Sequence, residues 1–155
     1  MKKLIWKLVL PLTVISFVTV TKWWYVDFVD GPDEILTGFP LPYVCPGWHT
    51  SLSLQIFVLE LVVDISTYFT FWFLLTYLMT IVFKEIKVPK FLTISLLTIS
   101  GLISLFLILM AINPDNIWTT TREYEMEKLE TGIKFLWEEQ TRPDYYKYHP
   151  KMKEE

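Results

Sequence analysis

Cys45 and His49 are the two residues whose types and spacing come closest to a reactive or metal-binding site. They lie in the stretch GFPLPYVCPGWHTS, residues 38–51, with three residues between them. A thiolate and an imidazole at this spacing could begin a zinc or copper site, or a nucleophilic pair. Structural zinc needs four protein ligands, and His149 is the only other histidine. We therefore interpret the stretch as a rigid loop with a packed thiol, and keep a thiol or metal site at Cys45 and His49 as a third hypothesis.

Glu60 and Asp64 form a second constellation, because residues four apart share one face of a helix. Acids in an apolar helix suggest proton or cation binding. Asp64 comes near the start of its apolar run, however, where water and a basic partner such as Lys22 or Arg122 can reach it. We favour a structural ion pair, and keep an oligomeric proton- or cation-coupled conductor using Glu60 and Asp64 as the alternative function.

Alternating prolines mark the first part of the loop. Pro40 and Pro42 lack an N–H and restrict the residues before them, so the backbone is expected to be extended or polyproline-like. Phe39 and Tyr43 flank the prolines. We expect Phe39, Pro40, Pro42 and Tyr43 to contact the membrane surface or a partner.

The GFPLPY loop is followed by a helix with an acid and then by the aromatic run YFTFWF. In this order the segments resemble small bacterial multi-span membrane proteins, most of which are uncharacterised. The resemblance covers residues 38–80, and it implies no activity, cofactor or residue role.

Three apolar runs, 4–21, 61–83 and 91–112, predict the elements that position these residues. Of the whole chain, 52% is hydrophobic and the mean hydropathy is +0.36. About 20 helical residues cross the ~30 Å hydrocarbon layer of a bilayer. We predict an all-α integral membrane protein, with a three-span membrane domain (1–112), an outer proline-rich loop (22–51) and a tail (113–155). The first run lacks a cleavage site, so it is interpreted as a retained signal anchor that Pro11 kinks.

Lysines predict the orientation, because cytoplasmic loops carry an excess of Lys and Arg. Lysines precede the first run and fill the short loop between the other two, whereas residues 22–51 are acidic. We expect a bacterial inner-membrane protein with a cytoplasmic N-terminus and a periplasmic or extracellular C-terminus. The acidic outer side argues against nucleic acid as a partner.

The tail contains an apolar series at helical spacing, formed by Met126, Leu129, Ile133, Leu136 and Trp137. This series predicts an amphipathic extracytoplasmic helix over 120–140. Its polar face is rich in glutamate, which favours a protein surface over anionic headgroups. We expect Leu129, Leu136 and Trp137 to contact a partner.

The sequence contains no phosphate-binding loop, HExxH or GxSxG motif. We therefore hypothesise a non-catalytic accessory or assembly subunit of a larger membrane or envelope complex. Its expected partners are the lipid bilayer and that complex. No cofactor, metal or soluble small-molecule substrate is expected.

Overall fold

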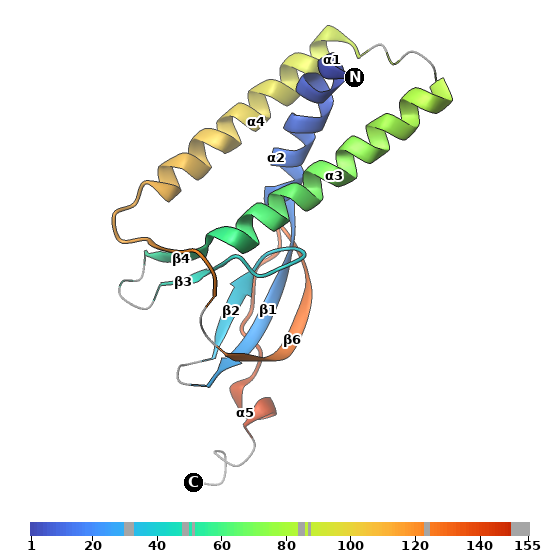
Figure 1. The fold of residues 1–155 in the computed structure, drawn as a ribbon. Helices are drawn as coiled ribbons and strands as arrows, with labels where there is room; N and C mark the ends of the chain where they lie inside the picture. The colour runs from blue at the N-terminus through green and yellow to red at the C-terminus, as the bar shows by residue number, and fades with distance from the viewer. Residues whose placement is uncertain are drawn as a thin grey trace.

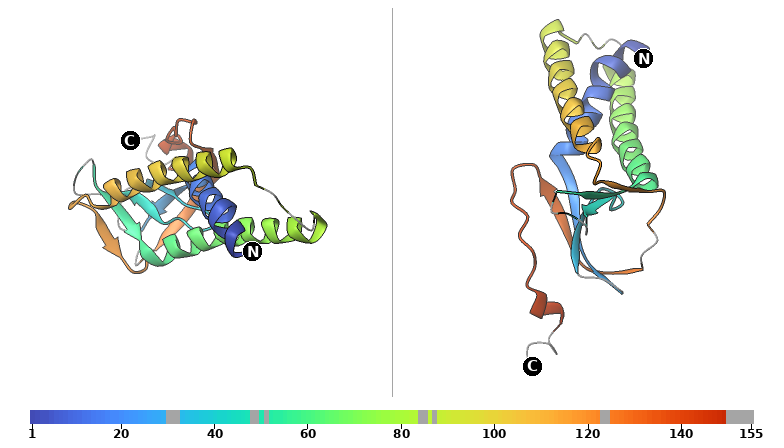
Figure 2. Two further views of the ribbon diagram at one scale, coloured as in Figure 1. Left: turned by 90° about the horizontal axis from the view of Figure 1, so that it is seen from above. Right: turned by 90° about the vertical axis from the view of Figure 1, so that its left-hand side faces the viewer.

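The computed structural model describes residues 1–29, 33–47, 50, 52–83, 86, 88–122 and 125–149. Helices form one layer and a sheet forms the other, stacked along one axis (Figure 1). The N-terminus lies at the end of the helical layer remote from the sheet. The short helix α5 (Tyr145–Tyr148) lies beyond the sheet at the opposite end of the molecule (Figures 1 and 2).

The prediction of an all-α protein with three spans is wrong, because the described chain is mixed α/β. Two of its helices are long and apolar enough to cross a bilayer, namely α3 (Val58–Phe83) and α4 (Lys90–Ala111). Their 26 and 22 residues correspond to about 39 and 33 Å at helical rise. In the most apolar 18-residue window of each, only 11% and 6% of the residues are buried, so these are not core helices of the sheet layer.

The first apolar run is helical but divided. It forms α1 (Lys2–Leu4), the π-helical segment η1 (Ile5–Val9) and α2 (Leu10–Thr19), and then continues directly into a strand at Val20. Pro11 explains the division, since its ring clashes with the carbonyl four residues earlier and the wider π-helical turn relieves that clash.

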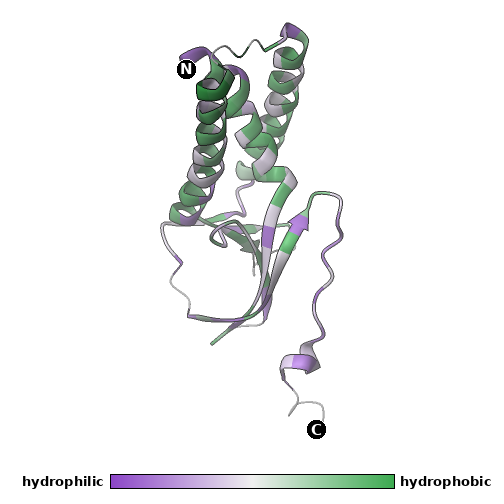
Figure 3. Ribbon diagram, turned by 90° about the vertical axis from the view of Figure 1, so that its right-hand side faces the viewer, coloured by the Kyte–Doolittle hydropathy of each residue, from purple (hydrophilic) through white to green (hydrophobic). Residues whose placement is uncertain are grey.

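The helix α2 lies between α3 and α4 and packs on both (Figure 2). The Trp72 indole Nε1 donates a hydrogen bond to Ser16 Oγ at 2.8 Å, which joins α3 to α2. On α4 the buried residue is Ser100, a small side chain that permits close approach. The remaining surface of α3 and α4 is predominantly apolar and exposed (Figure 3).

Within the described residues the sheet has six strands, in the order β5-β4-β3-β2-β1-β6. They are β1 (Val20–Phe28), β2 (Glu34–Thr37), β3 (Val44–Pro46), β4 (Leu54–Phe57), β5 (Ile117–Thr119) and β6 (Met126–Phe135). All neighbours are antiparallel except β4 and β5. The expected outer loop, residues 22–51, thus supplies most of β1 and all of β2 and β3. Val20–Phe28 is rich in β-branched and aromatic residues, which favour strands.

One face of the sheet carries the core. Its buried residues are Trp24, Val26, Phe28, Leu36, Cys45 and Phe57, with Met126 packed against them. On β1 the core residues alternate with Trp23, Tyr25 and Asp27, as the pleat of a strand requires. The chain after β6 returns over this second group, where the Tyr148 ring lies 5.7 Å from that of Tyr25.

The predicted amphipathic helix is also wrong, because residues 126–135 form β6, which pairs with the whole of β1. Gly132 shows why a glycine stands in this strand. A Cβ there would lie 2.7 Å from Trp23 Nε1, so the indole packs on the bare backbone. Tertiary pairing with β1 therefore outweighs the helical spacing of the apolar residues.

Candidate functional site

Asp64 fixes the proline-rich loop to the second turn of α3. Its side chain is fully buried. The carboxylate accepts hydrogen bonds from the backbone N–H of Phe39 at 2.5 Å and of Leu41 at 3.0 Å. The prolines at 40 and 42 have no N–H, so the donors come from alternate residues and converge on one acid. The GFPLPY sequence and Asp64 therefore act as one structural unit.

Gly38 and Trp24 hold the start of the same loop. The Trp24 indole donates to the Gly38 carbonyl at 2.9 Å. Gly38 has a φ of +153°, and a Cβ at this position would lie 2.0 Å from the Leu41 carbonyl oxygen. Only glycine fits there. The Phe39–Pro40 peptide bond is cis.

The four expected interaction residues of the loop have different surroundings. Phe39 is exposed and Pro40 is half-buried, whereas Pro42 is fully buried. Tyr43 is half-buried and stacks on Phe17 of α2 with ring centroids 5.2 Å apart. Of these four residues, Phe39 is therefore the best placed to contact a second molecule, while Pro42 and Tyr43 join the loop to the protein.

Glu60 lies one turn before Asp64 and is also buried. Its Oε2 atom has no hydrogen-bond partner among the residues that the structure describes, and the same holds for one terminal nitrogen of Arg122. Lys22, the other expected partner, places its Nζ 3.9 Å from the centre of the Trp24 ring. Both oxygens of Asp64 accept backbone hydrogen bonds, so this carboxylate has a structural role in holding the loop.

Cys45 is buried on β3, and its Sγ lies 3.9 Å from Gln55 Oε1 on β4. Burial, with a smaller contribution from the Glu34 charge, raises the pKa of Cys45 to about 12. The thiol is therefore protonated at neutral pH, which disfavours both nucleophilic attack and metal binding. His49 lies outside the described residues.

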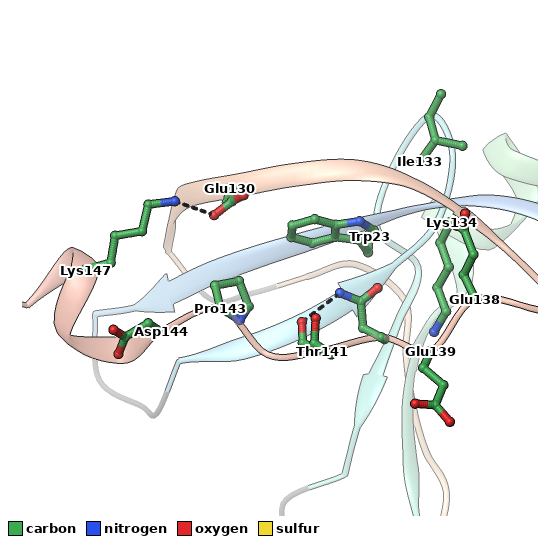
Figure 4. Close-up of a pocket in the computed structure, with 11 residues that line it drawn as sticks. Trp23, Glu130, Ile133, Lys134, Glu138, Glu139, Thr141, Pro143, Asp144 and Lys147 are labelled. Atoms are coloured by element: carbon green, nitrogen blue, oxygen red, sulfur yellow. Dashed lines mark hydrogen bonds and ion pairs between the residues drawn. The ribbon is translucent and has the colours of Figure 1, made fainter.

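A cleft of about 530 Å³ lies between β6 and the chain that follows it (Figure 4). Trp23 forms its floor. At one end Lys147 makes an ion pair with Glu130 at 3.0 Å, and the Tyr148 hydroxyl donates to the same carboxylate. The Tyr148 and Lys147 hydrogen bonds lower the pKa of Glu130. The other end is lined by Lys134, Glu138, Glu139 and Gln140.

Exposed apolar side chains adjoin this cleft. Ile133, Leu136 and Trp137 are 67%, 64% and 75% exposed, and Trp137 stacks on Phe135 at 5.1 Å. The Leu136 N–H donates to the Thr19 carbonyl, so this apolar rim lies where α2 passes into β1. Leu129, the third predicted contact residue of the tail, is half-buried.

The cleft and rim border an open edge of the sheet. β6 is the last strand in the order, with ten residues and, among the described residues, one neighbouring strand, β1. An edge strand presents unpaired N–H and C=O groups that can bind a further strand. Its glutamates and lysines keep the edge soluble and restrict which strands can pair with it.

Sequence reasoning named Leu136 and Trp137 but missed Trp23, Glu130 and Lys147, because the cleft exists only once β6 pairs with β1. The Thr131 hydroxyl donates to the Trp23 carbonyl across 108 positions of the chain. Gly132 was a signal of this packing in the sequence. An isolated glycine in a strand indicates that another group lies close to the backbone at that position.

Comparison of the chain with protein-family models, with curated proteins and with solved structures finds no significant match.

Proposed function

We propose that this protein is a membrane-anchored accessory or assembly subunit that binds an extended segment of a partner protein along β6. One observation carries the proposal: a ten-residue edge strand lies beside a cleft and an exposed apolar rim formed by Ile133, Leu136 and Trp137. In this mode of recognition the backbone supplies affinity, and the side-chain pockets beside the edge supply specificity.

Anchoring in a bilayer is supported by the exposed apolar surfaces of α3 and α4. In water such surfaces would favour aggregation, whereas each helix is long enough to cross a ~30 Å hydrocarbon layer. The two helices run in opposite directions and return the chain to the sheet layer (Figure 1). The sheet layer then lies on one side of the membrane, in water.

Lysines support the orientation. Lys2, Lys3 and Lys7 lie at the start of the chain and Lys90 begins α4, all toward the end of the helical layer remote from the sheet. The sheet layer is then extracytoplasmic. A periplasm-active reporter should be active when fused after Glu155 and silent after Lys87; the reverse pattern would contradict this orientation.

A protein partner fits the rim better than anionic lipid does. The surface around the cleft carries Glu130, Glu138 and Glu139. Glu127 adds a further acid on the same strand. Carboxylates are repelled by anionic headgroups, and a membrane-surface segment normally carries lysine and arginine instead.

Site-specific photocrosslinking tests the proposal. A benzophenone amino acid at Ile133 or Trp137 should give a discrete protein adduct in intact cells. The matched control is position 52, because Leu52 is apolar and 82% exposed but lies away from β6. Replacing Leu136 with serine should weaken the adduct, because burying a leucine side chain contributes on the order of 2 kcal/mol.

Two results would contradict the proposal. Adducts with lipid alone at positions 133 and 137 would make the rim a membrane contact. The same protein adducts from position 52 as from position 137 would show that crosslinking does not depend on β6.

A further inference from the structure

Asp27, Asp33 and His149 bring two carboxylates and an imidazole together at the end of the sheet farthest from the helical layer. Asp27 lies on β1, Asp33 directly precedes β2, and His149 follows α5. One ligand atom of each lies within 4.8 Å of the other two. The fold assembles this group from segments 116 positions apart.

We propose that these three residues form a binding site for a divalent transition-metal ion such as Zn²⁺. Neutral imidazole and ionised carboxylates are ligands that zinc, manganese and iron accept. Three protein ligands leave coordination positions for water. The three ligands are not among the residues that line the β6 cleft, and Cys45 is not one of them, so metal binding is tested without the proposed partner.

The distances fit such an ion. Asp33 Oδ2 and His149 Nε2 are 3.1 Å apart. Metal–ligand bonds of about 2.0–2.2 Å place neighbouring ligand atoms ~3.0–3.5 Å from one another. A carboxylate oxygen of Asp27, the third ligand, lies within 4.8 Å of both of these atoms.

Outer contacts orient the ligands, as is usual at metal sites. The Tyr25 hydroxyl donates to Asp33 Oδ2 at 2.8 Å. The Arg142 guanidinium donates to the Asp33 backbone carbonyl and thereby fixes the residue itself. The His149 ring stacks on Tyr145 with centroids 4.4 Å apart.

Charge gives a second reason for a cation. The Asp33 side chain is only 4% exposed. The Glu127 carboxylate is a third acid near this group, and the Arg142 guanidinium, bound to the Asp33 carbonyl, is the cation that faces it. Two carboxylates in contact repel each other unless a proton or a cation lies between them. A divalent ion removes this repulsion and lets both remain ionised.

Metal binding by the full-length protein in detergent tests the inference. After treatment with a chelator, the wild type should bind one equivalent of Zn²⁺ by calorimetry. Co²⁺ should bind there too, with visible absorption bands of nitrogen and oxygen ligation. His149→Gln should weaken Zn²⁺ binding at least tenfold. The matched control is His49→Gln, which removes the other histidine and should bind as the wild type does.

Asp33→Asn should also lose binding, and circular dichroism checks that this variant is folded. His149→Gln keeps the test decisive if Asp33→Asn does not fold, because position 149 lies in the C-terminal segment. The inference is overturned if the wild type binds no stoichiometric Zn²⁺. It is equally overturned if His149→Gln binds as tightly as the wild type, or if His49→Gln loses as much.

Discussion

Asp64 and Asp33, the two most buried aspartates in the described part of the chain, lie at opposite ends of the sheet layer and have different partners. Asp64 lies at the junction with the helices, and its two oxygens accept two backbone N–H groups. Asp33 lies at the far end and accepts from a tyrosine hydroxyl, with an imidazole and a second carboxyl beside it. Backbone donors cannot leave an acid without unfolding the loop, whereas side-chain donors can move to admit an ion. The donors therefore distinguish the two acids, because Asp64 is held by the backbone of the loop and Asp33 by side chains.

Replacing Asp64 should have the largest effect on stability, because it removes the acceptor that holds the proline-rich loop. Asp64→Ala leaves the part-buried N–H groups of Phe39 and Leu41 without their acceptor, at about 1–3 kcal/mol each. We expect the free energy of unfolding in detergent to fall by about 2–5 kcal/mol. Asp64→Asn should lose roughly half as much, since one amide oxygen remains as an acceptor. If the Asp64→Ala variant unfolds at the same temperature as the wild type, the loop does not depend on the Asp64 carboxylate.

The helical layer was largely predictable from the sequence, whereas the sheet was not. The predicted runs 61–83 and 91–112 match α3 and α4 closely, because apolar length is a local property. In β6, a β-bulge opposite Tyr25 and Val26 adds Leu129 to the strand and shifts its alternation by one residue. This shift hides the period of two. Met126, Leu129 and Ile133 then match a helical period that the strand does not follow.

The sequence indicated the pair of acids at the junction with the helices but not the group at the far end of the sheet, because only the first pair is local in the chain. Glu60 and Asp64 are one turn apart on one helix, so the sequence placed them together. Asp27, Asp33 and His149 meet only after the β1–β2 hairpin forms and the tail returns over it. Their approach depends on contacts between distant segments, which a pattern read along the chain does not contain.

Two glycine substitutions should have the next largest effect on stability. One lies in the sheet layer and the other in the helical layer, and we expect effects of opposite sign. Gly132→Ala places a Cβ 2.7 Å from the Trp23 indole, so we expect a loss of about 1–3 kcal/mol from overpacking. Gly101→Ala on α4 meets nothing within 4 Å and should stabilise the helix by up to about 1 kcal/mol.

Thermal unfolding of the two variants, side by side, measures the difference. If residues 126–135 were helical, both substitutions would stabilise the protein, because alanine is the better helix former. Opposite signs for Gly132→Ala and Gly101→Ala are therefore the result that the strand requires. If both variants were stabilised equally, residues 126–135 would not form β6, and the end of the sheet that β6 forms with β1 would not be as described.

The smallest effect is expected from Tyr25→Phe, which removes one donor from Asp33 and leaves the rest of the ring in place. Burial, followed by the Asp33 hydrogen bond, raises the pKa of Tyr25 to about 12, so the hydroxyl is a proton donor at neutral pH. A buried hydrogen bond contributes about 0.5–1.5 kcal/mol, and we expect a loss in this range in metal-free buffer. Tyr148→Phe is the matched control, because its hydroxyl donates to Glu130, whose side chain is 38% exposed against 4% for Asp33, and its loss should be smaller. The decisive comparison is with Asp64→Ala. Because Asp33 retains His149 when Tyr25 loses its hydroxyl, Tyr25→Phe must cost less than half as much. Equal costs would show that Asp33 is as firmly structural as Asp64, and that the far end of the sheet is not free to adjust around an ion.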